Sequence, residues 1–301
     1  MIETFLNLEP SIQSIIISAL VGFLSGILGA YFKYFLDKKA LRDKIQIEHE
    51  YSERKKLREL VGRYHGRILE DTERLNHRLW NLQQNENKGW LDMDGNFSQP
   101  ESNYYFTTTA YRTISLFTLI RLFEQEAIFI DSRIAKEGEL LFQKFIKAFE
   151  WVLTDVDLFR GLEYETFRQK DHLFRDKLRL LCDSCITEGK VISLEDFQER
   201  LKTDEGQNYL KPILTFFDGL CSGEKRLRWD RLISFHLLLM VFINKFGYDV
   251  QKSSKGQILE IAKSIKNPQV LMNLVNWLSR LGLGKETKYI VNVTNSIVSN
   301  R

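Results

Sequence analysis

The chain has 301 residues, of which 44% are hydrophobic and 28% are charged. This is enough for one sizeable domain or two small ones. The 43 Lys and Arg residues nearly balance the 40 Asp and Glu residues, which leaves a net charge of +3. Such a small excess gives no global basic field, so the composition argues against a nucleic-acid-binding protein.

An apolar segment follows a short N-terminal tail of residues 1–10. Residues 11–36 form this segment, and no charged side chain occurs between Ile12 and Phe32. A helix of about 21 residues crosses roughly 30 Å of hydrocarbon, the thickness of a bilayer core. A helix also satisfies its own backbone polar groups, as lipid requires. We therefore predict a single transmembrane helix over residues 11–36, with the lipid bilayer as its partner.

A secretory signal peptide is the alternative interpretation of this segment. Leu28-Gly29-Ala30 loosely matches a cleavage site. The ten residues before the segment, however, contain Glu3 and Glu9 and no Lys or Arg, whereas a signal peptide begins with a basic region. The apolar run is also longer than the core of a typical signal peptide, so an uncleaved anchor fits better.

The charges that flank the uncharged run predict its orientation. Basic residues follow it closely, whereas none precedes it; they are Lys33, Lys38, Lys39, Arg42 and Lys44. Positive residues stay on the cytoplasmic side of a membrane. We therefore expect a single-pass protein of the inner (plasma) membrane, with its N-terminus outside and its C-terminal domain in the cytoplasm.

Small residues recur at intervals of four along the segment. They form what we call the small-residue stripe: Ser14, Ser18, Gly22, Gly26 and Ala30. Residues four apart share one face of a helix, and small residues let membrane helices approach closely. The stripe predicts a homo-oligomer. Gly and Ser are also simply common in membrane helices, which is the alternative explanation.

The rest of the chain reads as all-α. Residues 37–56 carry dense mixed charge and predict a solvated helical stalk. An apolar stripe at helical spacing starts at Leu57 and predicts a helical cytoplasmic domain over residues 57–301. The whole chain contains only four prolines, which also favours helices. A loop interrupts it over residues 83–109, where Asp94-Gly95 suggests a tight turn and Trp90 and Phe97 flank it as a small hairpin.

Several later segments predict buried or capped helices. Residues 110–131 are apolar enough for a core helix but carry too many charges for a second membrane span. Residues 137–157 predict an amphipathic helix. The uncharged run from Leu232 to Asn244 has 13 residues, too few for a span and typical of a core helix. Ser193 should cap a helix, and Pro212 should occupy the first turn of another.

Two motifs suggest metal or redox chemistry. Cys182 and Cys185 form C-x-x-C, and Cys221 is the remaining cysteine. A structural zinc site normally needs four ligands, and these cysteines lie late in a predicted helix rather than at its start. Inert, partly buried thiols are therefore the better interpretation, with neither metal nor another cofactor expected.

A second candidate site contains Asp171, His172 and Asp176. On a predicted helix His172 and Asp176 are four residues apart and share a face, which suits a metal ligand pair or a base with its orienting carboxylate. The alternative is an ion-paired helix surface, because basic residues are interleaved with them.

A basic cluster surrounds Trp229 and consists of Lys225, Arg226, Arg228 and Arg231. Such a cluster can bind a phosphate, a nucleotide or lipid head groups. It is also typical of the solvated start of a helix whose Arg stems cover apolar surface.

These patterns favour a membrane-anchored interaction or effector protein. It would self-associate through its transmembrane helix and bind a cytoplasmic protein partner through its helical domain. A membrane-tethered metal-dependent or hydrolytic enzyme centred on Asp171, His172 and Asp176 is the first alternative. A toxin-like effector that permeabilises the membrane is the second.

Overall fold

The computed structural model describes residues 9–128, 135–164, 171–288, 290–292 and 294. Helices account for 75% of the chain and strands for 1%, which confirms the all-α prediction. Most of the predicted tail, residues 1–10, lies outside the described residues. By internal contacts the chain divides into two units, Met1–Lys55 and Lys56–Arg301.

The first described helix, α2, spans Pro10–Gln84. Among the described residues it contains the one helical stretch that is long and apolar enough to cross a membrane, and none of that stretch is buried. The predicted apolar stripe that starts at Leu57 is confirmed, because most of its members are buried in the second unit.

The second unit is built from short and medium helices. Its α-helices after α2 are α3 (Tyr104–Ala127), α4 (Glu137–Thr154), α5 (Arg175–Ser184), α6 (Leu194–Leu201), α7 (Asp204–Phe217), α8 (Arg228–Phe246), α9 (Lys255–Lys263) and α10 (Pro268–Arg280). Its 3-10 turns are η1 (Glu86–Lys88), η3 (Asp157–Phe159) and η4 (Asp249–Gln251). Its strands, β1 (Ile186–Thr187) and β2 (Lys190–Val191), pair antiparallel across a turn that contains Gly189.

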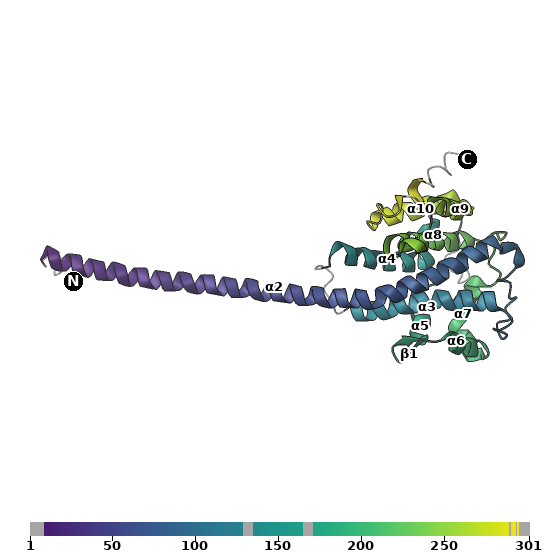
Figure 1. The fold of residues 1–301 in the computed structure, drawn as a ribbon, viewed down its shortest axis with the longest axis horizontal. Coiled ribbons are helices and arrows are strands. Elements are labelled where there is room, and N and C mark those ends of the chain that lie inside the picture. Colours follow the sequence, from purple (N-terminus) through teal and green to yellow (C-terminus); the bar gives the residue numbers. More distant parts are fainter. Residues whose placement is uncertain (1–8, 129–134, 165–170, 289, 293, 295–301) are drawn as a thin grey trace. The chain divides into compact units, whose positions relative to one another are not determined.

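The core of this unit surrounds α8, whose residues 228–243 are all buried. Helices α9 and α10 lie on one side of α8 and α3 on the other, with α5, α6 and α7 beyond α3 (Figure 1). Phe117 of α3 and Phe149 of α4 both pack against Phe235 of α8. The prediction of a core helix at 232–244 is therefore confirmed.

The predicted loop at 83–109 is shorter than expected. Helix α2 continues to Gln84 and α3 already begins at Tyr104. The threonines in the first turns of α3 are buried, and Thr108 and Thr109 donate their hydroxyls to carbonyls four residues back at 2.5 and 2.6 Å. Their polar groups are thereby satisfied inside the helix.

The predicted hairpin between Trp90 and Phe97 is wrong. The turn at Asp94-Gly95 is present, with positive φ at both residues. Its backbone, however, bonds to a distant side chain: Met93 N and Gly95 N donate to the Asp218 carboxylate at 3.0 and 3.1 Å. The only strands among the described residues are β1 and β2.

Two local features of the second unit test the helix-end predictions. Ser193 caps α6 as predicted, since its hydroxyl accepts from Asp196 N at 3.0 Å. The placement of Pro212 is wrong, because α7 starts at Asp204 and the proline lies in its interior. The N-cap Thr203, which accepts from Gly206 N at 3.1 Å, begins the helix earlier than the apolar pattern indicates.

Candidate functional site

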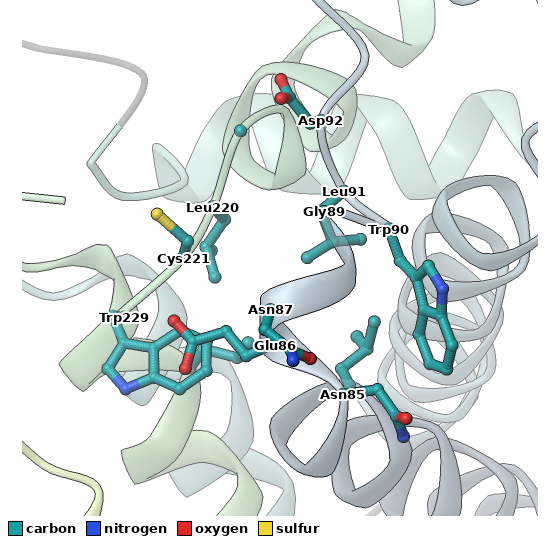
Figure 2. A pocket seen from close by; sticks show the side chains of 13 residues that line it. Asn85, Glu86, Asn87, Gly89, Trp90, Leu91, Asp92, Leu220, Cys221 and Trp229 are labelled. Atoms are coloured by element: carbon teal, nitrogen blue, oxygen red, sulfur yellow. The ribbon is translucent and has the colours of Figure 1, made fainter. Parts of the chain in front are cut away.

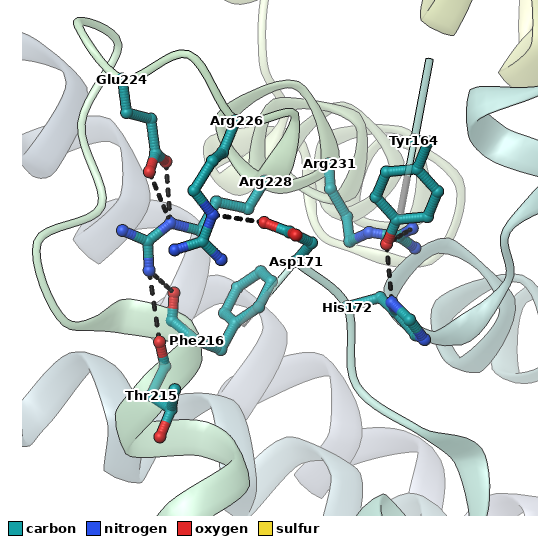
Figure 3. Close-up of polar contacts among 9 residues, drawn as sticks. All are labelled: Tyr164, Asp171, His172, Thr215, Phe216, Glu224, Arg226, Arg228 and Arg231. Carbon is teal, nitrogen blue, oxygen red and sulfur yellow. Dashed lines mark hydrogen bonds and ion pairs between the residues drawn. The ribbon is translucent and has the colours of Figure 1, made fainter. Parts of the chain in front are cut away.

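A network of arginines and carboxylates joins the start of α8 to Tyr164, Asp171 and His172 (Figure 3). Arg228 is 3% exposed, and its Nε lies 2.8 Å from both carboxylate oxygens of Glu224. Its Nη1 donates to the carbonyls of Thr215 and Phe216 at 3.2 and 2.8 Å. These carbonyls belong to the last turn of α7, where a cation is favoured by the helix dipole. Arg228 therefore fastens the end of α7 to the start of α8.

Arg226 forms an ion pair with Asp171, which is buried. This contact connects two groups that the sequence presented as separate candidate sites. A buried carboxylate requires such a partner, because an isolated charge in the interior is costly. The charge of Arg226 is therefore balanced within the protein.

Arg231 is fully buried in α8. Its Nη1 donates to the Val152 carbonyl at 2.7 Å, and its Nη2 lies 3.5 Å from the Tyr164 hydroxyl. The guanidinium also lies 4.5 Å from the centre of the Phe159 ring, a favourable cation–π distance. Burial lowers the pKa of Arg231, but an arginine side chain still carries only donors.

Burial determines the charge of His172. Its Nδ1 lies 2.6 Å from the Tyr164 hydroxyl, which also accepts a hydrogen bond from Arg231 Nη2 at 3.5 Å. Burial, followed by the charge of Arg231, lowers the pKa of His172 to about 4. His172 is therefore a neutral imidazole at pH 7.

The predicted helix-face pairing of His172 with Asp176 is wrong. Asp171 and His172 precede α5 in a turn, and only Asp176 lies on the helix, exposed in its first turn. The four-residue spacing therefore does not place them on one face. Lys225 is likewise exposed. The structure brings Asp171 to Arg226 and His172 near Arg231, whereas Asp176 and Lys225 are exposed at the surface.

The cysteines do not converge. Cys182 and Cys185 are buried at the end of α5, and burial raises the pKa of both thiols. Cys221 lies elsewhere, before α8, and is partly exposed. Among the described residues no group of three or more His, Cys, Asp or Glu side chains is close enough to hold a metal ion.

A cavity of about 270 Å³ lies beside Cys221, between η1 and the segment that leads into α8 (Figure 2). Glu86 extends across it toward Trp229 and accepts a hydrogen bond from Ser222 N. Asp92 and Trp90 also line the cavity. Its mixture of carboxylates and indole rings suits a small polar ligand. The sequence pattern of the 83–109 loop predicted a hairpin beside Trp90 and did not predict this cavity.

All five residues of the small-residue stripe are exposed along α2 in the first unit. A Cβ atom built on Gly22 or Gly26 would meet no other atom within 4 Å. The stripe therefore has room for close approach by another helix. It also has room for a larger side chain within the chain itself.

No known protein family, curated protein or solved structure matches this chain. The chemistry of its own residues is what distinguishes the candidate functions. The charged candidates for catalysis and anion binding largely neutralise one another, whereas the apolar stretch of α2 has no cover within the described residues.

Proposed function

We propose that this protein is a membrane-anchored interaction or effector module. Residues 11–36 anchor it in the inner membrane, and residues 57–301 form a cytoplasmic helical domain that binds a protein partner. One observation carries the proposal: the apolar part of α2 is uncharged from Ile12 to Phe32, and none of it is buried.

The apolar side chains of this part of α2 are exposed, so they require lipid or protein to shield them from water. Ile15, Phe23 and Leu28 are 69%, 67% and 67% exposed. Each such side chain gains about 1.5–3 kcal/mol when it leaves water. Soluble proteins rarely expose contiguous apolar surface of this size. Lipid covers every face of the helix at once, which fits a stretch that is apolar on all sides.

The flanking charges support a cytoplasmic domain. The five basic residues after the uncharged run, from Lys33 to Lys44, lie on the side where the inner leaflet carries anionic lipid. Each contributes about 1 kcal/mol near such a surface. The small-residue stripe supports self-association within the membrane, because it allows close backbone contact with a second copy.

A binding role suits the state of the candidate catalytic groups. Asp171 is paired with Arg226, and His172 Nδ1 is hydrogen-bonded to the Tyr164 hydroxyl. Asp176 lies exposed in the first turn of α5. A base that is already hydrogen-bonded and a carboxylate that is already ion-paired serve the fold of the domain. This arrangement favours a module that presents a surface over an enzyme centred on these residues.

Lysine substitutions in the anchor test the proposal. Lysine costs about 2.5–3.5 kcal/mol at the centre of a membrane helix, so Leu20→Lys/Leu24→Lys should move the full-length protein from the membrane fraction to the supernatant after alkaline extraction. Leu41→Lys/Ile45→Lys is the matched control: both positions are exposed on the same helix outside the anchor. This control should remain in the membrane. Extraction of the wild-type protein by alkali would contradict the anchor.

A further inference from the structure

A second cavity lies in the domain between α2 and α3, with a volume of about 320 Å³. From α2 it is lined by Asp71 and Arg74, and from α3 by Tyr104, Arg112 and Ser115. It belongs neither to the network around Arg231 nor to the cavity beside Cys221. Its charged lining comes from two helices that are adjacent in the fold (Figure 1).

Two of the lining residues are arginines held close together. Arg112 Nη1 donates to the Arg74 carbonyl at 2.9 Å, which fixes the Arg112 side chain against α2. Arg74 in turn contacts Glu70 at 2.5 Å and Asp71 at 3.9 Å. Burial lowers the pKa of Arg112, and repulsion from the Arg78 and Arg74 guanidinium groups lowers it further. The guanidinium groups of Arg74 and Arg78 therefore lie close enough to repel that of Arg112 beside this cavity.

The third arginine, Arg78, lacks the partners that a buried cation needs. It is only 4% exposed, and its Nε and Nη1 have no hydrogen-bond acceptor within the described part of the chain. Its guanidinium stacks instead on Tyr104 and Tyr105, 5.2 and 4.8 Å from the ring centres. A buried guanidinium without a carboxylate is costly unless an anion compensates it. Tyr104 connects Arg78 to the cavity, because the same ring lines it.

We propose that this cavity binds a small phosphate monoester, whose phosphate group is received by Arg74 and Arg112. The positive charge of Arg78, whose guanidinium stacks on the Tyr104 ring that lines the cavity, adds to the attraction for an anion. The planar guanidinium fork matches the geometry of phosphate oxygens, and a dianion balances clustered cations better than a single carboxylate does. The volume exceeds that of a bare phosphate ion, so an organic part fits beside the Tyr104 and Tyr111 rings. Tyr111 is held in place by the hydrogen bond from its hydroxyl to the Ile192 carbonyl, at 3.0 Å.

Asp71 is the one carboxylate in the lining and acts against an anion. It accepts from the Ser115 hydroxyl at 2.5 Å, and burial raises its pKa. Neutralising this residue should therefore improve phosphate binding, whereas loss of an arginine should weaken it. Stronger binding after one substitution and weaker binding after the other would distinguish a specific phosphate site from general attraction to a basic surface.

The test is a calorimetric titration of the full-length protein in zwitterionic detergent with inorganic phosphate, at constant ionic strength. The wild type should bind phosphate, and Arg112→Gln should weaken binding about tenfold or more. Asp71→Asn should strengthen binding several-fold. The matched control is Arg58→Gln, which removes an exposed guanidinium from α2 about 24 Å along the helix from Arg74 and should leave binding unchanged.

A second arm identifies the source of the phosphate group. Glycerol 3-phosphate represents a soluble monoester, and phosphatidic acid in a phosphatidylcholine nanodisc represents a lipid head group. Tighter binding of glycerol 3-phosphate than of inorganic phosphate supports a soluble ligand. Loss of inorganic phosphate binding when the nanodisc contains phosphatidic acid supports a lipid.

Two results would overturn the inference. One is a wild-type protein that binds no inorganic phosphate. The other is an Arg112→Gln protein that binds it as tightly as the wild type does. Far-ultraviolet circular dichroism of each variant checks the fold, and Arg78→Met, which keeps the apolar stem over the tyrosine rings, provides a second loss of charge should Arg112→Gln prove unfolded. Neither result depends on whether the chain is membrane-anchored.

Discussion

At the scale of single residues, His236 shows how burial controls charge in this domain. It lies on α8 with no exposed surface, and its Nε2 is 3.0 Å from Asn76 Oδ1. The Asn76 oxygen is an acceptor, so Nε2 carries the proton. Its Nδ1 has no partner within the described part of the chain, and burial lowers the pKa of His236 to about 3. Protonation would place an unpaired charge in the core.

This environment predicts a loss of stability in mild acid. The pKa of His236 in the folded protein lies below its unfolded value of about 6.5. Neutral His236 therefore leaves the folded state at full stability above pH 6.5, and this stability is lost as the pH falls toward 3. Between pH 7.5 and 5.5 His236 should cost about 1.4 kcal/mol of unfolding free energy. Denaturant unfolding measures the free energy of unfolding at both pH values. Between pH 7.5 and 5.5 the His236→Gln protein should lose about 1.4 kcal/mol less of this free energy than the wild type does.

The control for this measurement is His77→Gln. The His77 side chain is 70% exposed, so the variant should keep the wild-type dependence on pH. Comparison of pH dependences rather than of absolute stabilities separates the titration from any packing defect that His236→Gln introduces. Parallel curves for the wild type and His236→Gln would show that His236 does not titrate as its burial requires.

At the scale of elements, the small-residue stripe of α2 predicts how copies of the anchor meet. Gly22→Ile/Gly26→Ile should reduce the protomer count in mild detergent to one, because the larger side chains separate the backbones. A Cβ added to either glycine has no neighbour within 4 Å, so the substitution causes no clash inside the chain. Sedimentation or light scattering in detergent measures the count.

The matched control places isoleucines on the opposite face of the same helix. Leu20 and Leu24 lie about 200° around the helix from Ser18 and Gly22, so Leu20→Ile/Leu24→Ile should leave the protomer count unchanged. A wild type that is already monomeric would mean that the small residues reflect only the composition of a membrane helix. The anchor would then be a tether alone.

Elements with a strong apolar period were predictable from the sequence. The apolar stripe from Leu57 and the 13-residue run in α8 follow directly from spacing and length. Elements governed by distant partners were not. The turn at Asp94-Gly95 is held by Asp218, more than 120 residues away in the chain, so its local sequence suggested a hairpin instead.

The candidate site was predictable only in part, for the same reason. The sequence singled out Asp171, His172 and the arginines before and within α8, and these residues do lie together. Their mutual pairing joins positions 55 or more residues apart and has no local signature. Interleaved charges near position 172 also resembled a helix surface, whereas the chain there forms a turn.

At the scale of the whole molecule, the C-terminal part of α2 belongs to the core of the domain. Eight apolar residues between 56 and 84 are buried: Leu57, Leu60, Tyr64, Ile68, Leu69, Leu75, Leu79 and Leu82. At about 1.5–3 kcal/mol each, their burial is comparable with the total stability of a domain.

This burial predicts where the chain can be shortened. A fragment of residues 56–301 should be soluble, helical and cooperative in thermal unfolding. A fragment of residues 86–301, which lacks α2, should aggregate or unfold without cooperativity because the core loses one of its sides. Circular dichroism melts of the two fragments provide the comparison. Equal cooperativity in both would show that α2 contributes nothing essential to the core.

The most direct test of the membrane-anchored module is protease accessibility in sealed membranes. The full-length protein, produced in bacterial cells, is exposed to protease in intact spheroplasts and in inverted inner-membrane vesicles. We predict that the domain survives in spheroplasts and is degraded in inverted vesicles, with the uncharged run of α2 left in the membrane. Degradation in spheroplasts, or recovery of the intact chain in the soluble fraction, would contradict the central claim.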